Sequence, residues 1–284
     1  MTHETLLPAG EIDLAATLDG GQAFRWRREG DGYRGVIGRS VLHISMEAAG
    51  RVRVRVLAGE RVQPVDVERY LGLDFDLDAF RERYAADPGL APALAACAGL
   101  RVLRQDPWEC LCGFICSATN SIPQIKRNVA ALAADAGERI GPSDGDFVFP
   151  DAAAVAGLGE PRLRELGLGF RARYVAAAAE AIASGAWDLA ALPGIPYEMA
   201  KGALAALPGV GPKIADCVLA FSLDKGEAFP VDIWVRRAVL RRYGLSDETR
   251  DNEIGRFARA RFGRDAAYAN QYLFHHQRLT AQAG

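Results

Sequence analysis

Residues 207–217 read Leu-Pro-Gly-Val-Gly-Pro-Lys-Ile-Ala-Asp-Cys, and this stretch decides how the rest of the chain is interpreted. The first proline cannot continue a preceding helix, because it lacks the backbone N–H donor. Gly209 and Gly211 allow a tight turn and leave no Cβ between the backbone and an approaching ligand. A second helix can begin near Lys213, so that the N–H groups of the turn, including that of Val210, face outward with the positive end of the helix dipole. The pattern predicts a hairpin between two helices that cradles a phosphate group.

Helical periodicity surrounds this hairpin on both sides. Apolar residues recur every three or four positions over residues 67–84, 107–115, 122–132, 171–183, 197–207, 213–222, 233–243, 251–262 and 266–279. In so helical a context, the phosphate-binding hairpin is favoured over the alternative, a structural turn that only joins two packed helices.

The first sixty residues have a different pattern, which is typical of β-strands. Residues 51–56 read Arg-Val-Arg-Val-Arg-Val, an alternation that places the valines on one face of a strand. Two shorter runs, 32–37 and 41–46, are separated by a turn and predict an antiparallel meander. The arginines could contact DNA, but an edge strand with a solvated outer face favours charged residues there. The predicted fold class is therefore α+β, with an N-terminal antiparallel β-rich subdomain over residues 1–100 and an all-α helix-hairpin-helix core over residues 101–284.

The composition narrows the class of protein. Half of the 284 residues are hydrophobic and a quarter are charged, which excludes a largely disordered chain. No apolar run approaches the ~20 residues of a membrane-spanning helix, and the N-terminus lacks the pattern of a signal peptide, so a cytoplasmic location is expected. The formal net charge is −2, yet residues 201–284 carry 13 Lys and Arg against 9 Asp and Glu. This basic balance permits binding to nucleic acid.

The residues that follow the hairpin indicate covalent catalysis. Residues 229–232 read Phe-Pro-Val-Asp, and with the hairpin they resemble the helix-hairpin-helix DNA glycosylases of base excision repair, which have Pro-Val-Asp at this place. Removing a base by covalent catalysis requires an amine that attacks the sugar C1′ and leaves a Schiff base. Lys213 lies at a helix start, where the positive field disfavours its ammonium form. Asp232 can stabilise positive charge that develops on the sugar, and it can also cap the following helix.

Further motifs identify the branch of this family. Residues 20–26 read Gly-Gly-Gln-Ala-Phe-Arg-Trp, residues 106–111 read Asp-Pro-Trp-Glu-Cys-Leu, residues 114–117 read Phe-Ile-Cys-Ser, and residues 166–174 read Leu-Gly-Leu-Gly-Phe-Arg-Ala-Arg-Tyr. With the hairpin and Pro-Val-Asp, they follow one another as in the 8-oxoguanine DNA glycosylases of eukaryotic type. This resemblance extends from about residue 7 to residue 275.

The cysteines indicate that no metal or cofactor is bound. The endonuclease III-like branch of the superfamily carries an iron–sulfur cluster on four C-terminal cysteines, whereas no cysteine follows Cys217 here. Cys110, Cys112 and Cys116 lie in an apolar segment, which favours buried thiols over metal ligands. With Cys97 and Cys217 they make five cysteines, an odd number, which indicates reduced thiols.

The resemblance implies a pocket for the damaged base. Members of the family extrude the target nucleotide from the duplex, because its glycosidic bond is inaccessible in the base stack. The carbonyl of Gly21 is expected to accept a hydrogen bond from the N7–H that 8-oxoguanine has and guanine lacks. Cys217 and Phe274 are expected to sandwich the base, and Phe221 to line the pocket. Without the resemblance, the two phenylalanines would be interpreted as helical core.

The resemblance also implies contacts with the duplex. Phe170 is expected to wedge into the site that the base vacates, and Arg171 to face the orphaned partner base. The hairpin residues 209–211 and Pro230 are expected to contact the DNA backbone.

Four positions expected to contact the base or the DNA depart from the family pattern. Members usually have three asparagines after the Cys-Ser, and here the asparagine that contacts the partner cytosine is replaced by Thr119, with Asn120 beside it. An arginine that reads the partner base is replaced by Gln124. A pocket glutamine that pairs with the Watson–Crick edge is replaced by Asn270, and a phosphate-contacting histidine by Trp234. These departures leave the catalytic residues intact and predict relaxed selection of the partner base.

The sequence thus predicts a bifunctional enzyme that acts as a monomer on double-stranded DNA. It would remove 8-oxoguanine through a lysine Schiff base and then cleave the strand by β-elimination. One alternative is a glycosylase for another damaged purine, such as an alkylated base, which the altered Asn270 and Trp234 suggest. The other is a non-catalytic hairpin protein that only binds DNA, and the presence of both Lys213 and Asp232 argues against it.

Overall fold

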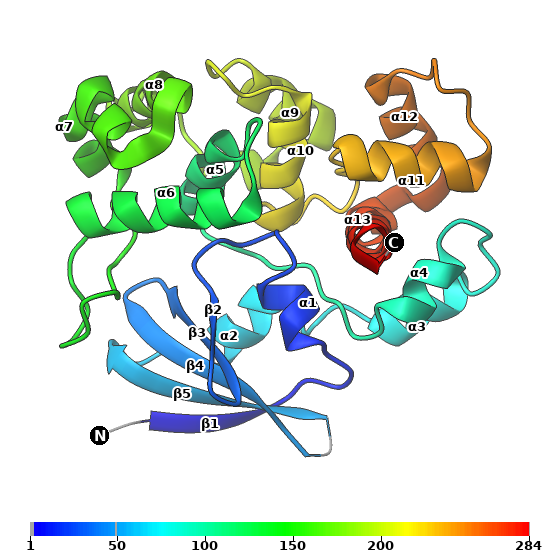
Figure 1. Ribbon diagram of the computed structural model, residues 1–284, viewed down its shortest axis with the longest axis horizontal. Coiled ribbons are helices and arrows are strands. Elements are labelled where there is room, and N and C mark those ends of the chain that lie inside the picture. The colour runs from blue at the N-terminus through cyan, green and yellow to red at the C-terminus, as the bar shows by residue number, and fades with distance from the viewer. Residues whose placement is uncertain (1–2, 49, 284) are drawn as a thin grey trace.

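The computed structural model describes residues 3–48 and 50–283, and its N-terminal part contains one antiparallel sheet (Figure 1). The strand order is β1-β5-β4-β3-β2. The five strands are β1 (His3–Pro8), β2 (Arg27–Glu29), β3 (Gly32–Ile37), β4 (Ser40–Glu47) and β5 (Arg51–Gly59). The predicted meander is confirmed as β3-β4-β5, whereas β1 and the three-residue β2 are too short or too irregular in pattern to be found from periodicity.

The alternating strand β5 has the two faces that its sequence predicts. Val52 and Val54 are buried in the core of the sheet. Arg53, on the opposite face, forms ion pairs with Glu4 and Glu47. The outer face of the strand is charged, as predicted, but β5 lies between β1 and β4 and is not the edge strand that the sequence suggested. Its charge is accommodated by ion pairs with neighbouring carboxylates.

A helical body contains most of the remaining chain (Figure 1). The α-helices are α1 (Leu14–Leu18), α2 (Pro64–Tyr70), α3 (Leu77–Arg83), α4 (Ala91–Ala96), α5 (Pro107–Cys116), α6 (Ile122–Ala136), α7 (Ala152–Leu163), α8 (Ala172–Ala183), α9 (Tyr197–Ala205), α10 (Pro212–Phe221), α11 (Ile233–Tyr243), α12 (Asp251–Phe262) and α13 (Ala266–Ala283). Shorter turns of helix are η1 (Arg164–Leu168), η2 (Gly169–Arg171), η3 (Leu192–Gly194) and η4 (Gly263–Asp265). The sheet followed by this helical body confirms the predicted α+β class.

The structure differs from the predicted helices at one clear place. The periodicity over residues 67–84 predicts one helix, whereas the chain forms α2 and α3 with a break between them. Gly72 in the break has φ +63°, a left-handed conformation that ends α2. Asp76 then starts α3, because its carboxylate accepts a hydrogen bond from the N–H of Ala79 (2.9 Å). Apolar spacing alone cannot reveal such a break.

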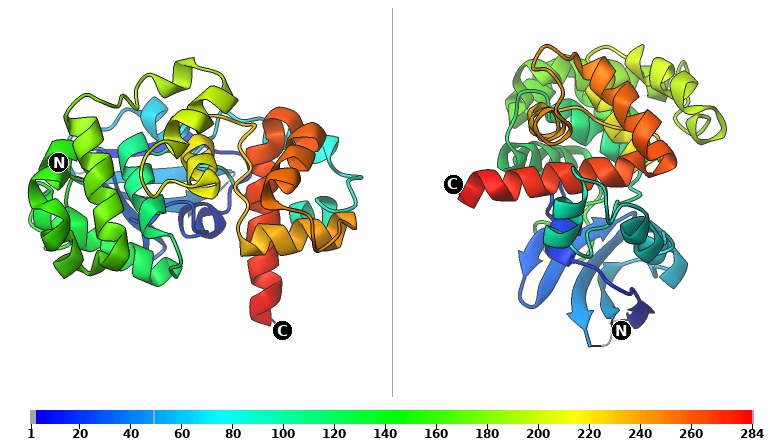
Figure 2. Two further views of the ribbon diagram at one scale, coloured as in Figure 1. Left: turned by 90° about the horizontal axis from the view of Figure 1, so that it is seen from above. Right: turned by 90° about the vertical axis from the view of Figure 1, so that its right-hand side faces the viewer.

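The long C-terminal helix α13 runs between the helical body and the sheet (Figure 2). Phe80 of α3 packs against Tyr268 and Tyr272 of α13, with ring centroids 5.6 and 5.7 Å apart. Side chains from α3 and α4 therefore join the helical core, although they precede it in sequence. The division of the chain near residue 100 stays a prediction.

The fully buried side chain of Gln22 connects the two parts of the molecule. Its Nε2 donates to the carbonyls of Thr17 (3.0 Å) and Arg101 (2.7 Å), and its Oε1 accepts from the N–H of Leu103 (3.0 Å). The backbone carbonyl of Gln22 accepts from Nε2 of Gln105 (2.7 Å). One amide thus fixes the loop after α1 against the segment that leads into α5.

Replacing Gln22 by leucine is expected to lower the free energy of unfolding by ~3 kcal/mol, since three buried backbone groups lose their partner. Gln22→Glu keeps the volume but buries a carboxylate against the carbonyl oxygens of Thr17 and Arg101, which lose their donor, so its loss should be at least as large. Denaturant unfolding monitored by tryptophan fluorescence measures both. A loss below ~1 kcal/mol for Gln22→Leu would show that this amide does not hold the two parts together.

Candidate active site

The hairpin joins α9 to α10, and its two glycines have different tasks. Gly209 has φ +79°, and a Cβ there would lie 2.3 Å from Cγ of Tyr174, so this position requires glycine for internal packing. No atom lies within 4 Å of the corresponding point at Gly211, which leaves this side of the turn open. The side chain of Val210 is buried, and its N–H donates to the carbonyl of Leu207 (3.1 Å). The open surface is therefore formed by Gly211 and the start of α10, and the N–H of Val210 already has a partner within the turn.

Lys213 extends from the first turn of α10. Its Nζ donates to Oγ of Ser117 at the end of α5 (3.1 Å). The same Nζ lies 5.3 Å from the ring centroid of Phe114, which stacks on Phe221. The lysine is half-buried, and its amine is held between α5 and α10, facing a pocket.

Asp232 is the N-cap of α11, as predicted. Its Oδ1 accepts from the backbone N–H groups of Trp234 (2.9 Å) and Val235 (2.8 Å). Burial raises the pKa of this carboxyl, while these two hydrogen bonds and the positive charges of Lys213 and Arg278 act in the opposite direction. The carboxylate is thus kept in a partly buried place where its charge is costly unless a cation lies near it.

One pocket brings Lys213 and Asp232, the predicted catalytic residues, together with all the residues expected to hold the base. It is lined by Gly21, Phe114, Lys213, Cys217, Phe221, Pro230, Asp232, Val235, Asn270, Gln271 and Phe274. These residues come from the N-terminal loop, α5, α10, the start of α11 and α13, so no single segment makes the pocket.

The N-terminal loop closes one side of this pocket. Gly21 has φ +97°, and a Cβ there would lie 2.8 Å from Cδ1 of Ile122 and 3.5 Å from Cε1 of Phe274. Arg278 of α13 holds the loop, since its Nη1 donates to the carbonyl of Gly20 (3.0 Å). The guanidinium also lies 5.3 Å from the ring centroid of Phe274. The left-handed backbone at Gly21 favours glycine, and the absence of a Cβ leaves room beside Ile122 of α6.

The polar groups of the pocket are few. Burial raises the pKa of the Cys217 thiol to about 12, so the sulfur is neutral and serves as an apolar surface. Nδ2 of Asn270 donates to the carbonyl of Pro230 (2.8 Å). Pro230 is itself buried in the pocket wall. The amide of Asn270 therefore holds the segment that leads to Asp232.

Several residues of the site were not expected from the sequence. Ser117 and Phe114 position the lysine, and Gln271, Val235 and Arg278 line or brace the pocket. The helical spacing from Phe274 to Arg278 could have indicated a shared face. No comparable signal marks Ser117, because its contact with Lys213 joins residues far apart in the chain.

An exposed aromatic side chain lies near the loop after α5. Phe170 is 45% exposed and sits in η2. The guanidinium of Arg171 lies 4.5 Å from its ring centroid, and donates to the carbonyls of Ala118 (2.7 Å) and Thr119 (2.9 Å). Phe170 and the loop after α5 are therefore fixed to each other.

Two of the departures from the family pattern, Thr119 and Gln124, lie in the loop after α5 and at the start of α6. Thr119 is exposed and has φ +50°, which is unfavourable for a β-branched residue. Nδ2 of Asn120 donates to the carbonyl of Cys116 (2.9 Å) and its Oδ1 accepts from the N–H of Ser121 (3.0 Å), so this amide is engaged within the loop. Oε1 of Gln124 accepts from Nε of Arg127 (3.1 Å).

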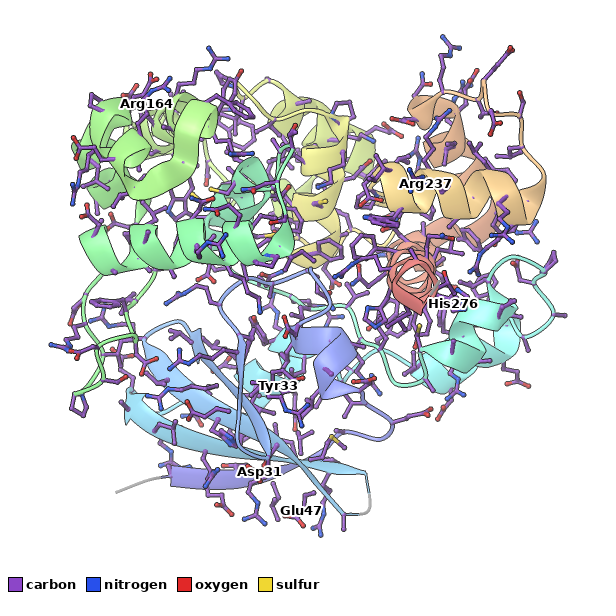
Figure 3. The ribbon with its side chains drawn as sticks, in the orientation of Figure 1. Asp31, Tyr33, Glu47, Arg164, Arg237 and His276 are labelled. Carbon is purple, nitrogen blue, oxygen red and sulfur yellow. The ribbon has the colours of Figure 1, made fainter. Side chains whose placement is uncertain are left out.

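Trp234 is half-buried at the start of α11. The guanidinium of Arg237, which projects from the same helix (Figure 3), lies 5.6 Å from the ring centroid of Trp234. A cation thus stands beside the position where family members have histidine.

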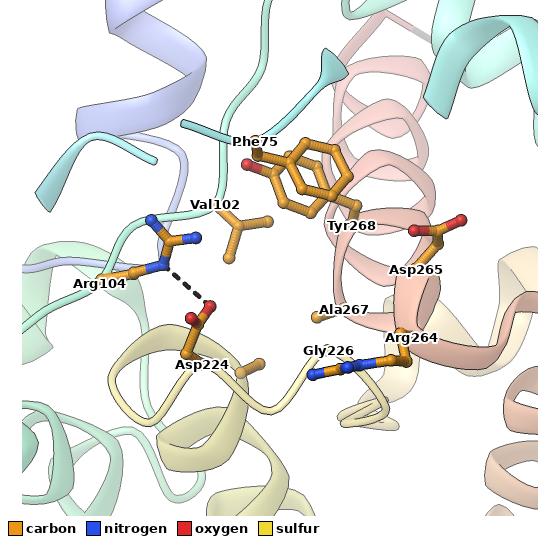
Figure 4. A pocket seen from close by; sticks show the side chains of 10 residues that line it. Phe75, Val102, Arg104, Asp224, Gly226, Arg264, Asp265, Ala267 and Tyr268 are labelled. Carbon is orange, nitrogen blue, oxygen red and sulfur yellow. Dashed lines mark hydrogen bonds and ion pairs between the residues drawn. The ribbon is translucent and has the colours of Figure 1, made fainter. Parts of the chain in front are cut away.

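A second cavity, shown in Figure 4, is lined by a different set of residues from the pocket at Lys213. Arg104 crosses its wall and pairs with Asp224 (2.9 Å) and Asp74. Phe75 and Tyr268 stack at its edge, with centroids 3.7 Å apart. Its charges are already paired, and it contains neither Lys213 nor Asp232, so it is not the reactive site.

Two absences apply to the described residues, 3–48 and 50–283. No group of three or more His, Cys, Asp and Glu side chains is placed to hold a metal ion there. No helix in these ranges is long and apolar enough to cross a membrane. All five cysteines are buried, unpaired thiols, which agrees with the interpretation of Cys110, Cys112 and Cys116.

Comparison with known proteins assigns both parts of the chain. Residues 5–111 match the 8-oxoguanine DNA glycosylase N-terminal domain, and residues 112–262 match the HhH-GPD superfamily of base excision DNA repair proteins. The chain is 30% identical to a probable N-glycosylase/DNA lyase of Methanothermobacter thermautotrophicus, across 96% of this chain and 95% of the relative. It is 32% identical to an N-glycosylase/DNA lyase of Arabidopsis thaliana, across 93% and 77%.

Solved structures support the same family assignment. The 8-oxoguanine glycosylase/lyase of Clostridium acetobutylicum, in complex with double-stranded DNA containing cytosine opposite 8-oxoguanine, is 30% identical with a TM-score of 0.91, over 99% of this chain and 98% of that one. The 3-methyladenine DNA glycosylase of Archaeoglobus fulgidus, at 20% identity and a TM-score of 0.77, shares the fold alone. The chain therefore belongs to the HhH-GPD superfamily of base excision DNA repair proteins, and carries the N-terminal domain of its 8-oxoguanine DNA glycosylases.

Proposed function

We propose that this protein excises 8-oxoguanine from duplex DNA and cleaves the strand at the resulting abasic site. The observation that carries the proposal is one pocket in which Lys213 and Asp232 meet Gly21, Cys217 and Phe274. The relatives described above are named as N-glycosylase/DNA lyases, and one was solved with 8-oxoguanine in DNA. We also infer that it acts in the cytoplasm of a bacterial-type cell, as a monomer, where its five reduced thiols are stable.

Base removal starts with the extruded nucleotide in the pocket. Cys217 and Phe274, which line the pocket, would contact the two faces of a purine, and the carbonyl of Gly21 is the acceptor for its N7–H. The neutral amine of Lys213 attacks C1′, and the C1′–N9 bond breaks with its electron pair on the base. The base takes up the proton that the new C1′–N bond releases from nitrogen. Asp232 stabilises the positive charge on the sugar while this bond breaks.

Strand cleavage follows from the same covalent bond. The sugar ring opens when the C1′–O4′ bond breaks, O4′ takes a proton, and a protonated Schiff base to Lys213 remains. This imine acidifies a C2′ hydrogen, so a base can remove it as the 3′ phosphate leaves. Water then hydrolyses the imine and restores the amine.

Contacts with the duplex are assigned to the surface around the pocket. Phe170 is the exposed aromatic that would fill the vacated site, with Arg171 beside it. The open face at Gly211 and the positive start of α10 suit a backbone phosphate. Arg237, stacked on Trp234, is placed to supply a cation near the position where relatives use histidine.

Lys213→Gln should abolish the covalent intermediate while leaving DNA binding, since glutamine keeps the length but has no nucleophilic amine. Borohydride reduction in the presence of an 8-oxoguanine duplex should trap an adduct with the wild type and none with the variant. An adduct of undiminished yield in Lys213→Gln would assign the Schiff base to another amine.

Asp232→Asn should slow single-turnover excision roughly 10²-fold or more, because one preorganised charge is lost at the reacting sugar. Asparagine still caps α11, so the free energy of unfolding should stay within ~1 kcal/mol of the wild type. Burial raises the pKa of Asp232, so ionisation costs the folded wild type stability as the pH rises above about 4. The stability difference should therefore move in favour of the variant between pH 4 and pH 7.

Two results would contradict this role. Excision within threefold of the wild type would show that the charge does not act on the sugar. A large loss of stability in Asp232→Asn would show that the carboxylate serves the fold instead.

Thr119→Asn should strengthen the preference for cytosine over adenine opposite the lesion. Asparagine tolerates a positive φ better than threonine, so the variant should also gain ~1 kcal/mol of stability. Thr119→Gly is the matched control, because it relieves the backbone without adding an amide. Single-turnover excision opposite each of the four bases, with thermal unfolding, measures both effects. Equal selectivity in all three proteins would show that another residue reads the partner base.

A further inference from the structure

Gln271 contributes a buried amide to the wall of the pocket. It lies on α13 and is 2% exposed. Within the part of the chain that the structure describes, its Nε2 has no hydrogen-bond partner. It lines the same pocket as Lys213 and Asp232. Because a buried donor without a partner costs free energy, such a group in a ligand pocket indicates a ligand that completes it.

The neighbouring amide is already used. Nδ2 of Asn270 donates to the carbonyl of Pro230 (2.8 Å), two residues before Asp232. To donate to a base, this amide would have to leave that carbonyl, and the segment that carries the catalytic carboxylate would lose its support. Within the described residues, Nε2 of Gln271 makes no hydrogen bond that it would have to give up. The side chain of Gln271 is also one methylene longer than that of Asn270.

We propose that Gln271 is the residue that reads the Watson–Crick edge of the extruded base, and that Asn270 is a positioning residue for the Asp232 segment. The inference rests on the proposed function. A carboxamide presents a donor beside an acceptor, and 8-oxoguanine keeps the guanine edge, with the acceptor O6 beside the donor N1–H. Nε2 can therefore donate to O6 while Oε1 accepts from N1–H. The contact with the Watson–Crick edge, which the resemblance placed at position 270, is thus made by the next residue of α13.

The other groups of the pocket cannot do this. The Cys217 thiol is neutral and a weak partner, and Phe274 offers only a ring. Lys213 and Asp232 are assigned to the reaction at the sugar. Gln271 lies three residues before Phe274, so both side chains lie on one side of α13, one against the face of the base and one at its edge.

The test compares two reactions of the full-length protein. The first is single-turnover excision from a duplex with 8-oxoguanine opposite cytosine, which requires recognition of the base. The second is borohydride trapping on a duplex with a preformed abasic site, which has no base to read. Gln271→Met keeps the shape of the side chain and removes both hydrogen bonds. It should slow excision roughly ten- to a hundredfold, and trapping should stay within about twofold of the wild type.

Two further variants separate the roles. Asn270→Leu should slow both reactions, because the Asp232 segment loses its anchor. Gln277→Met, the same change on α13 outside the pocket, should alter neither reaction.

Unchanged excision by Gln271→Met would overturn the inference and leave the proposed function standing. Equal slowing of both reactions by Gln271→Met would also overturn it, because it would indicate a structural role. A wild type that traps abasic sites but does not excise 8-oxoguanine would overturn the proposed function itself.

Discussion

The buried amide of Gln22 fixes the relation between the N-terminal loop and the helical body, and the pocket depends on this relation. Its side chain makes three hydrogen bonds, which join the loop after α1 to the end of α1 and to the segment before α5. Its carbonyl accepts from Gln105, whose own N–H donates to the carbonyl of Phe221 at the end of α10 (2.8 Å). The wall at Gly21 is thereby tied to the helix that carries Lys213. A pocket built from two parts of the chain can keep a fixed width only if such a connection is rigid.

The chemistry of the site uses groups that also maintain the fold. Asp232 starts α11 with two hydrogen bonds, and the same carboxylate faces the pocket with Lys213. Its burial is unfavourable for the charge, and nearby cations offset part of this cost. Arg278 is one of them, and it also holds the carbonyl of Gly20. The same few residues at the start of α11 and on α13 therefore cap a helix, hold the N-terminal loop and set the charge of the pocket.

Local periodicity predicts the fold class, the helices α5 and α6 and those from α8 onward, and the structure confirms them. The catalytic roles of Lys213 and Asp232 come from a motif and stay a prediction. Such patterns do not predict contacts between residues that are far apart in the chain. Nothing local shows that Gln22 is fully buried, that Ser117 contacts Lys213, or that Gln271 faces the pocket beside an engaged Asn270. These facts follow from how distant segments pack, which periodicity does not encode.

The most direct test is a crystal structure of the Lys213→Gln variant bound to a duplex with 8-oxoguanine opposite cytosine. We predict that the damaged base lies outside the stack, between Cys217 and Phe274, with its N7–H on the carbonyl of Gly21. The amide of Gln271 should lie at the O6 and N1 positions. A base that remains stacked in the duplex, or that enters another cavity, would contradict both proposals.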